Sequence, residues 1–226
     1  MIEKYKSFVL DCDGVILDSN RIKTEAFRKA LADEPVELVE EFIQYHKDNG
    51  GVSRYIKLQY YFQEIKKKKE YSQILNETLV RFAEIVRSEL VKASMVPGVE
   101  AFLMLCQEKG IPCFVNSGGD QDELREVFVE RGIGSLFELI LGSPTSKKDN
   151  LAKLLVENRL QQPVLFFGDA YSDYIAAEAY EIDFVYVSNV SEWGEGKSFC
   201  LNKNIPVIES FKEVIKNDIV KVNKKG

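Results

Sequence analysis

The sequence predicts an α/β protein with an open parallel sheet that is covered by helices on both faces. Three observations support this prediction. Short, continuous apolar runs alternate with helical segments, which is typical of strands buried on both faces. One long internal region has helical spacing and lacks such runs, which predicts an all-helical insertion. Polar residues directly follow several of the runs, so a site is expected where the strands end.

The candidate strands are five apolar runs, bounded by polar residues or glycine. They lie at residues 8–10, 112–116, 139–142, 164–167 and 184–187. The second run is followed by Ser117-Gly118-Gly119, and a helix is expected from about residue 120 to 131. The order of strands and helices along the chain indicates a parallel sheet with crossover helices.

The predicted insertion covers residues 17–94, and the α/β core is expected to contain residues 1–16 and 95–226. Apolar residues in the insertion recur at helical spacing, as at Phe42 and His46. His46 is the only histidine of the chain. Its spacing from Phe42 favours a packing role for it.

Composition excludes several classes of protein. The chain has 226 residues with a formal net charge of −6, so no general attraction to nucleic acid or anionic membranes is expected. No segment resembles a signal peptide or a membrane span, and four cysteines without metal-binding spacing are expected to be buried thiols. These features predict a soluble cytoplasmic protein and leave its oligomeric state open. The last residues, KVNKKG at 221–226, are expected to fray.

The polar residues that follow the runs belong to three short segments. They are Asp11-Cys12-Asp13-Gly14, Asn116-Ser117-Gly118-Gly119 and Gly168-Asp169-Ala170-Tyr171-Ser172-Asp173, while Lys147 and Lys148 come shortly after the third run. In an open α/β sheet, ligands bind beyond the carboxyl ends of the strands. Carboxylates, a hydroxyl, backbone amides and a lysine are therefore expected to converge there.

This combination of groups suits phosphoryl transfer. Asp11 and Asp13 lie on one face of an extended chain, and carboxylates this close repel each other unless a cation lies between them. Oxygen ligands without histidine or cysteine indicate Mg²⁺ rather than zinc. Ser117, with glycines expected to open a helix, supplies a hydroxyl and amides for an anion, and a lysine adds a positive charge. Phosphoryl transfer requires such parts.

Four segments resemble the motifs of the haloacid dehalogenase-like (HAD) hydrolase superfamily, in the order that the family has them. They are DCDGVILDS at 11–19, Ser117, Lys147 within SKKDN, and GDAYSDYIAA at 168–177. The insertion resembles the helical cap of the phosphoglycolate phosphatase and β-phosphoglucomutase-like branch. The resemblance implies a Rossmann-like three-layer parallel-sheet core with an inserted all-helical cap domain.

The resemblance also implies roles for the acidic residues. Asp11 would attack phosphorus and form an aspartyl-phosphate, and Asp13 would protonate the leaving alcohol and then activate water. Mg²⁺ would be held by the Asp11 carboxylate, the Asp13 backbone carbonyl and Asp169. Asp173 would support the metal site.

Phosphate contacts are implied for Ser117, Gly118 and Lys147. The family's second motif often continues with a polar side chain, whereas Gly118 leaves only its backbone amide. Lys148 adjoins Lys147, and the spacing to the following acid favours Lys147. In the cap, Arg54 follows a glycine-rich turn and is either a clamp for a second anionic group of the substrate or a surface arginine at a helix start.

The function implied is a Mg²⁺-dependent phosphatase acting on a small-molecule phosphomonoester, such as a sugar phosphate or a phosphoglycolate-like compound. A phosphomutase of the same superfamily is the nearest alternative and shares every core residue. Asp13 and Asp169 argue against a metal-independent dehalogenase. A non-catalytic phospho-aspartate signalling or binding module is a further alternative, although receiver domains are about half this length and have no insertion.

Overall fold

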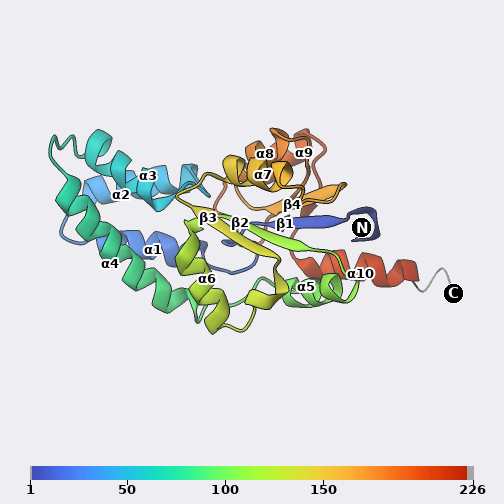
Figure 1. Ribbon diagram of the computed structural model, residues 1–226. Coiled ribbons are helices and arrows are strands. Elements are labelled where there is room, and N and C mark those ends of the chain that lie inside the picture. The colour runs from blue at the N-terminus through green and yellow to red at the C-terminus, as the bar shows by residue number, and fades with distance from the viewer. Residues whose placement is uncertain (1, 223–226) are drawn as a thin grey trace.

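The computed structural model describes residues 2–222 and confirms the α/β class. Six parallel strands form one sheet in the order β3-β2-β1-β4-β5-β6 (Figure 1). Their bounds are β1 Ser7–Leu10, β2 Cys113–Asp120, β3 Leu139–Ser143, β4 Val164–Gly168, β5 Asp183–Val187 and β6 Val207–Ile208. The five apolar runs therefore lie in strands, except that Pro112 precedes β2. The two-residue β6 was not predicted, because so short a segment carries no periodicity.

The central strand β1 is apolar on both sides because helices cover both faces of the sheet. All four of its residues are buried. Phe8 pairs with Cys113 of β2 and with Leu165 of β4, so both edges of β1 are hydrogen-bonded. Side chains alternate between the faces of a strand, and accordingly Phe8 and Val9 belong to two separate hydrophobic clusters.

Two helical layers sandwich the sheet. One layer contains α5 (Val99–Glu108), α6 (Gln121–Glu130) and α10 (Phe211–Val222), and the other contains α7 (Lys147–Val156), α8 (Tyr171–Glu178) and α9 (Gly196–Asn202) (Figure 1). Short 3₁₀ turns lie at Ile2–Lys4 and Gly134–Leu136. Only residues 221–222 of the segment expected to fray are described, and they belong to α10; residues 223–226 lie outside the described part.

The remaining helices form the inserted cap. They gather to one side of the sheet, at the left of Figure 1, and are α1 (Asn20–Ala30), α2 (Val36–Asp48), α3 (Arg54–Tyr60), a π-helical turn (Tyr61–Ile65) and α4 (Ser72–Leu90). Aromatic residues fill the space between them: the ring centroids of Phe27 and Phe42 lie 5.1 Å apart, and those of Phe27 and Phe82 lie 4.1 Å apart. The insertion therefore has its own apolar contacts and joins the core through two neighbouring chain segments, with Leu17 bridged to Met95.

The segment after Asn116 differs from the sequence prediction. Gly118 and Gly119 were expected to open a helix, but they belong to β2, and α6 begins only at Gln121 with Asp120 as its N-cap. The strand continues because Asp120 pairs with Ser143 of β3 after an irregularity in register. The glycine amides therefore lie on an extended segment and not at a helix N-terminus.

Two further expectations concern the whole chain. All four cysteines are buried thiols, as expected for residues that pack in the core. Among residues 2–222, no helix combines the length and the apolar character that crossing a membrane requires.

Candidate active site

The carboxyl edge of the sheet brings three carboxylates together. Asp11 directly follows β1, Asp169 directly follows β4, and Asp173 lies in the first turn of α8. Leu10 and Phe167 are paired across β1 and β4, so the residues that follow these strands meet. Oxygen atoms of the three carboxylates all lie within 4.8 Å of one another.

A lysine from a third segment enters this cluster. Lys147 is the first residue of α7, whose N-cap Ser146 accepts a hydrogen bond from the Asp149 amide at 3.1 Å. Lys147 Nζ lies 3.0 Å from Asp11 Oδ1 and 2.5 Å from Asp173 Oδ1. Lys148 is exposed. The structure therefore brings Lys147, and not its neighbour, to the carboxylates.

Burial makes this cluster electrostatically costly. Burial, together with the neighbouring charges of Asp173 and Asp13, raises the pKa of Asp11 to about 7 even though Lys147 opposes the shift. Burial and the charge of Asp11 also raise the pKa of Asp169 well above its usual value. Burial disfavours the ammonium of Lys147, but Asp11 and Asp173 outweigh it and raise the pKa of that lysine. One lysine does not neutralise three buried carboxylates.

These residues fit a magnesium ion. Asp11 Oδ1 is buried and makes no hydrogen bond to the side chains described, those of residues 2–216, since its contact with Lys147 lacks hydrogen-bond geometry. A hard divalent cation takes oxygen ligands of this kind and would relieve the repulsion among Asp11, Asp169 and Asp173. Asp173 also caps the start of α8, because its second oxygen accepts a hydrogen bond from the Ala170 amide at 3.1 Å.

The carboxylate of Asp13 lies outside that cluster and has partners of its own. It is ion-paired with Lys23 of α1 and accepts a hydrogen bond from Ser19 Oγ at 2.6 Å. Although burial opposes the shift, the charge of Lys23 and these hydrogen bonds lower the pKa of Asp13. The sequence prediction did not include Lys23. The sequence feature that could have pointed to Lys23 is its position one helical turn after Ser19, which places both side chains near the DxD segment.

Asp169 is oriented by a residue that the sequence prediction also missed. Asn20, at the start of α1, donates one hydrogen bond to Asp169 Oδ2 at 2.6 Å and one to the Val190 carbonyl at 3.0 Å. Gly14 lies against the same carboxylate with φ +76°, and a Cβ there would stand 2.1 Å from Asp169 Oδ2. The glycine after the DxD segment is therefore required by close packing and by its left-handed backbone.

The segment expected to bind phosphate lies directly beside the cap. Ser117 is fully buried, and its Oγ accepts a hydrogen bond from the Gly119 amide at 3.0 Å. A Cβ on Gly118 would stand 2.0 Å from the Gly51 carbonyl oxygen of the cap turn. Ser172 Oγ donates to the neighbouring Gly50 carbonyl at 2.9 Å. The cap turn is thus seated on the core at this point.

Arg54 is not a surface residue. It is 6% exposed, and its guanidinium makes two hydrogen bonds to Glu123 of α6, at 3.0 and 2.7 Å. The guanidinium also lies over the Phe82 ring, 5.1 Å from its centroid. The sequence could not predict this partner, because Glu123 belongs to the core and is distant in the chain.

His46 packs as expected and is also hydrogen-bonded. Its ring meets Phe27 edge-on with centroids 4.8 Å apart. Its Nδ1 lies 2.8 Å from Lys57 Nζ, and its Nε2 lies 3.1 Å from Thr24 Oγ1. Burial and the charge of Lys57 lower the pKa of His46 well below its usual value, so the ring is neutral.

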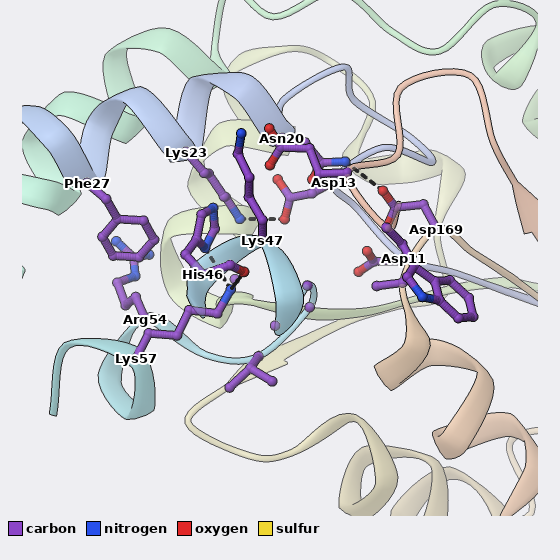
Figure 2. A pocket seen from close by; sticks show the side chains of 18 of the residues that line it. Asp11, Asp13, Asn20, Lys23, Phe27, His46, Lys47, Arg54, Lys57 and Asp169 are labelled. Atoms are coloured by element: carbon purple, nitrogen blue, oxygen red, sulfur yellow. Dashed lines mark hydrogen bonds and ion pairs between the residues drawn. The ribbon is translucent and has the colours of Figure 1, made fainter. Parts of the chain in front are cut away.

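Core and cap enclose a cavity of about 50 Å³ between them, which has room for a few water-sized groups. Asp11, Asp13 and Asp169 line its core side (Figure 2). Lysines and an arginine on the helices of the insertion line the other side: Lys23, Lys47, Arg54 and Lys57. Ser117 and Lys147 are not among the residues that line this cavity, and Gly118 is.

Solved structures share this fold over nearly the whole chain. A predicted phosphoglycolate phosphatase from Haemophilus somnus 129PT superposes with a TM-score of 0.76 at 16% identity, covering 95% of this chain and 98% of that one. A β-phosphoglucomutase from Clostridium difficile superposes with a TM-score of 0.73 at 19% identity, covering 98% of each chain. A predicted phosphatase from Clostridium acetobutylicum gives 0.73 at 16% identity, with 95% and 98% covered. At these identities the likeness concerns the fold.

Sequence comparison identifies the family. No curated protein matches the chain. A family model described as haloacid dehalogenase-like hydrolase matches residues 5–180, which include all four motif segments and the whole insertion. The fold and the order of the motifs agree with that match, and the chain belongs to the haloacid dehalogenase-like hydrolase family.

Proposed function

We propose that this protein is a Mg²⁺-dependent phosphatase that hydrolyses a small-molecule phosphomonoester through an aspartyl-phosphate on Asp11. One observation carries the proposal: Asp11 is buried, with an oxygen that makes no hydrogen bond within the described chain, next to both a lysine and two further carboxylates. A carboxylate has two oxygens, so one can bind the cation while the other attacks phosphorus. The family match and the phosphatase neighbours support the same reaction class.

In the first step, an Asp11 oxygen forms a bond to phosphorus while the bond between phosphorus and the leaving oxygen breaks. Asp13 gives its proton to that leaving oxygen, and the alcohol departs. In the second step, water attacks phosphorus, Asp13 takes a proton from the water, and the bond between Asp11 and phosphorus breaks. One carboxyl group thus serves as acid and then as base.

The residues around Asp11 neutralise the phosphoryl group. Lys147 places a positive charge beside the nucleophile, and the amide of Gly118 is a candidate donor to a phosphoryl oxygen. Asp11, Asp169 and the Asp13 carbonyl would hold Mg²⁺, with Asp173 close enough to act as a ligand or to support one. When bound, the ion supplies charge neutralisation for the phosphate and for the carboxylates.

Lys23 is part of this proposal as a positioning residue. Its ion pair holds the Asp13 carboxylate at the cavity wall and lowers the pKa of that group. A general acid needs a proton, so a substrate phosphate that draws Lys23 toward itself would free Asp13 to carry one. Lys23 would in this way couple substrate binding to the protonation of Asp13.

The same proposal assigns residues 17–94 to a cap that closes over the core formed by residues 1–16 and 95–226. The boundaries fall where the two connections run side by side, with the Asp18 amide donating to the Ser94 carbonyl at 2.9 Å and the Val96 amide to the Ile16 carbonyl at 3.0 Å. Closure would exclude bulk water during the attack on phosphorus.

The test is a screen of phosphomonoesters with Mg²⁺ and with a chelator, read as release of inorganic phosphate. We expect release that depends on Mg²⁺ and is absent in Asp11→Asn. Release without any bisphosphate activator distinguishes the phosphatase from a phosphomutase. Undiminished turnover by Asp11→Asn, or by the chelated wild-type enzyme, would overturn the mechanism.

A further inference from the structure

The cations that line the cavity differ in their partners. Lys23 is ion-paired with Asp13, and Arg54 is ion-paired with Glu123. Lys57 is 3% exposed and has no carboxylate within ion-pair distance among residues 2–216, whose side chains the structure describes. In its protonated form it is therefore a buried ammonium that faces the cavity without a counterion from the described side chains.

Lys57 is held by His46. Its Nζ donates to His46 Nδ1 at 2.8 Å and to the His46 carbonyl at 3.1 Å. An ammonium has three N–H donors, so one donor remains without an acceptor in the described part of the protein. Figure 2 shows Lys57 and His46 on the cap side of the cavity whose other side carries Asp11, Asp13 and Asp169.

The hydrogen bonds continue from His46 to the core, and in each of them the donor lies on the Lys57 side and the acceptor on the Glu192 side. With Nδ1 accepting from Lys57, the neutral ring carries its proton on Nε2 and donates to Thr24 Oγ1 at 3.1 Å. The Thr24 hydroxyl in turn donates to Glu192 Oε2 at 2.9 Å. Glu192 belongs to the core loop after β5, whereas the other three residues belong to the helices of the insertion. The chain of bonds is complete only when the cap lies against the core.

This arrangement is costly if it serves stability alone. An ammonium removed from water without a counterion is among the most unfavourable groups to bury. A hydrophobic residue of similar length would fill the same place between the helices of the insertion without that cost. The cost is recovered when a negatively charged ligand group takes the remaining donor.

We propose that Lys57, positioned by the chain from Glu192 through Thr24 and His46, binds an anionic group of the substrate other than the phosphate that is hydrolysed. The inference rests on the proposed phosphatase function and specifies the substrate class: a small phosphomonoester with a second oxyanion, either a carboxylate or a phosphate. From the sequence, Arg54 was the residue considered as a clamp for a second anionic group. Its guanidinium is already engaged by Glu123. Lys47 also lines the cavity but is only half-buried, so Lys57 is the buried cation that remains.

Three esters with one three-carbon skeleton test the proposal. Glycerol 3-phosphate has no second anion, 3-phosphoglycerate has a carboxylate, and glycerol 1,3-bisphosphate has a second phosphate. A hydrogen bond to a charged group contributes enough to change kcat/KM by about 10- to 100-fold. We expect the wild-type enzyme to prefer at least one of the two anionic esters over glycerol 3-phosphate by such a factor, and the preferred ester identifies the oxyanion.

Variants of the chain separate recognition from folding. Lys57→Met is expected to lose the preference, mainly through KM, while Lys57→Arg retains part of it. Thr24→Val is expected to weaken the preference, and Thr24→Ser, which keeps the hydroxyl, to restore it. The matched control is Lys29→Met, which makes the same change at an exposed position of α1 and is expected to leave all three rates within about twofold.

The outcomes distinguish this inference from the function on which it rests. If the wild-type enzyme hydrolyses all three esters equally, or if Lys57→Met lowers all three rates by the same factor, the role of Lys57 is refuted while the phosphatase stands. If the wild-type enzyme hydrolyses no phosphomonoester with Mg²⁺ present, the proposed function fails and the inference fails with it.

Discussion

The two walls of the cavity carry opposite charges and are built in different ways. On the core wall, Asp11 and Asp169 are placed by the backbone, because each directly follows one of two paired strands. On the cap wall, Lys23 and Lys57 extend from helices and are placed by side-chain partners, Asp13 of the core and His46 of the cap. The core wall therefore depends on sheet topology, whereas the cap wall depends on how the cap is seated. Substitutions on each wall can show whether the core wall carries the chemistry and the cap wall carries substrate recognition.

The largest effect is expected at the core wall. Asp11→Asn removes the nucleophile and should lower kcat by roughly 10⁴-fold or more. It also removes one of the three mutually repelling carboxylates, so the melting temperature should not fall. Phosphate release and thermal unfolding of the same preparation check both statements. A variant that unfolds at lower temperature would indicate that Asp11 also stabilises the core.

The second prediction concerns the ion pair between Arg54 of the cap and Glu123 of the core. Arg54 and Glu123 are 6% and 9% exposed, and Arg54→Met leaves the Glu123 carboxylate buried without a cation. We expect a loss of about 3–5 kcal/mol in the free energy of unfolding. The double variant with Glu123→Leu should recover most of that loss.

The control for that prediction is an exposed pair in the same cap. Arg81 is ion-paired with Asp33 at 2.7 Å, with side chains 40% and 82% exposed. Arg81→Met should cost about 0–1 kcal/mol. Equal costs for Arg54→Met and Arg81→Met, measured by urea denaturation, would contradict the assignment of Arg54 as the buried connection between cap and core.

A third prediction addresses the contact between the walls at Asp13. Lys23→Met removes the ion pair that positions the general acid, and kcat should fall by about 10- to 100-fold. Lys23→Arg, which keeps the positive charge, should retain more activity than Lys23→Met. Steady-state kinetics with the exposed Lys29→Met as control measure the effect. Full activity of Lys23→Met would remove Lys23 from the proposed mechanism.

The smallest effect is a pH dependence of stability at the cap wall. Burial, with the charges of Lys23 and Lys147, lowers the pKa of Lys57 from 10.5 to about 7, although Asp13 and Glu192 oppose the shift. Below pH 7 the folded and unfolded states both carry the ammonium, and folding bears the full cost of burying it. As pH rises from 7 toward 10.5, the folded state releases the proton first, so this cost decreases and stability rises.

Lys57→Met removes that cost. The variant should therefore gain more stability over the wild-type protein at pH 6 than at pH 9, by about 1–2 kcal/mol in the free energy of unfolding. Denaturant unfolding at the two pH values measures the difference. A gain of the same size at both values would show that Lys57 does not titrate in this range.

The fold was largely predictable because its strands are local patterns. The runs at 8–10 and 164–167 are apolar throughout, as strands buried on both faces must be, and both lie in observed strands. The continuation of β2 through Gly118 and Gly119 was not predictable in the same way. Glycine normally favours a turn, and here pairing of Asp120 with Ser143 of a neighbouring strand overrides that preference.

By itself, the sequence determined the sheet, the insertion, the family and the positions of the acidic residues, because strand ends and motif spacing are properties of contiguous chain. Only the tertiary structure decided which charges neutralise one another. Glu123 pairs with Arg54, Asp13 pairs with Lys23, and Lys57 is left with a neutral histidine. The physical reason is that ionic partners act through space over a few ångströms, so the packing of the cap against the core selects them and the local pattern of the chain does not.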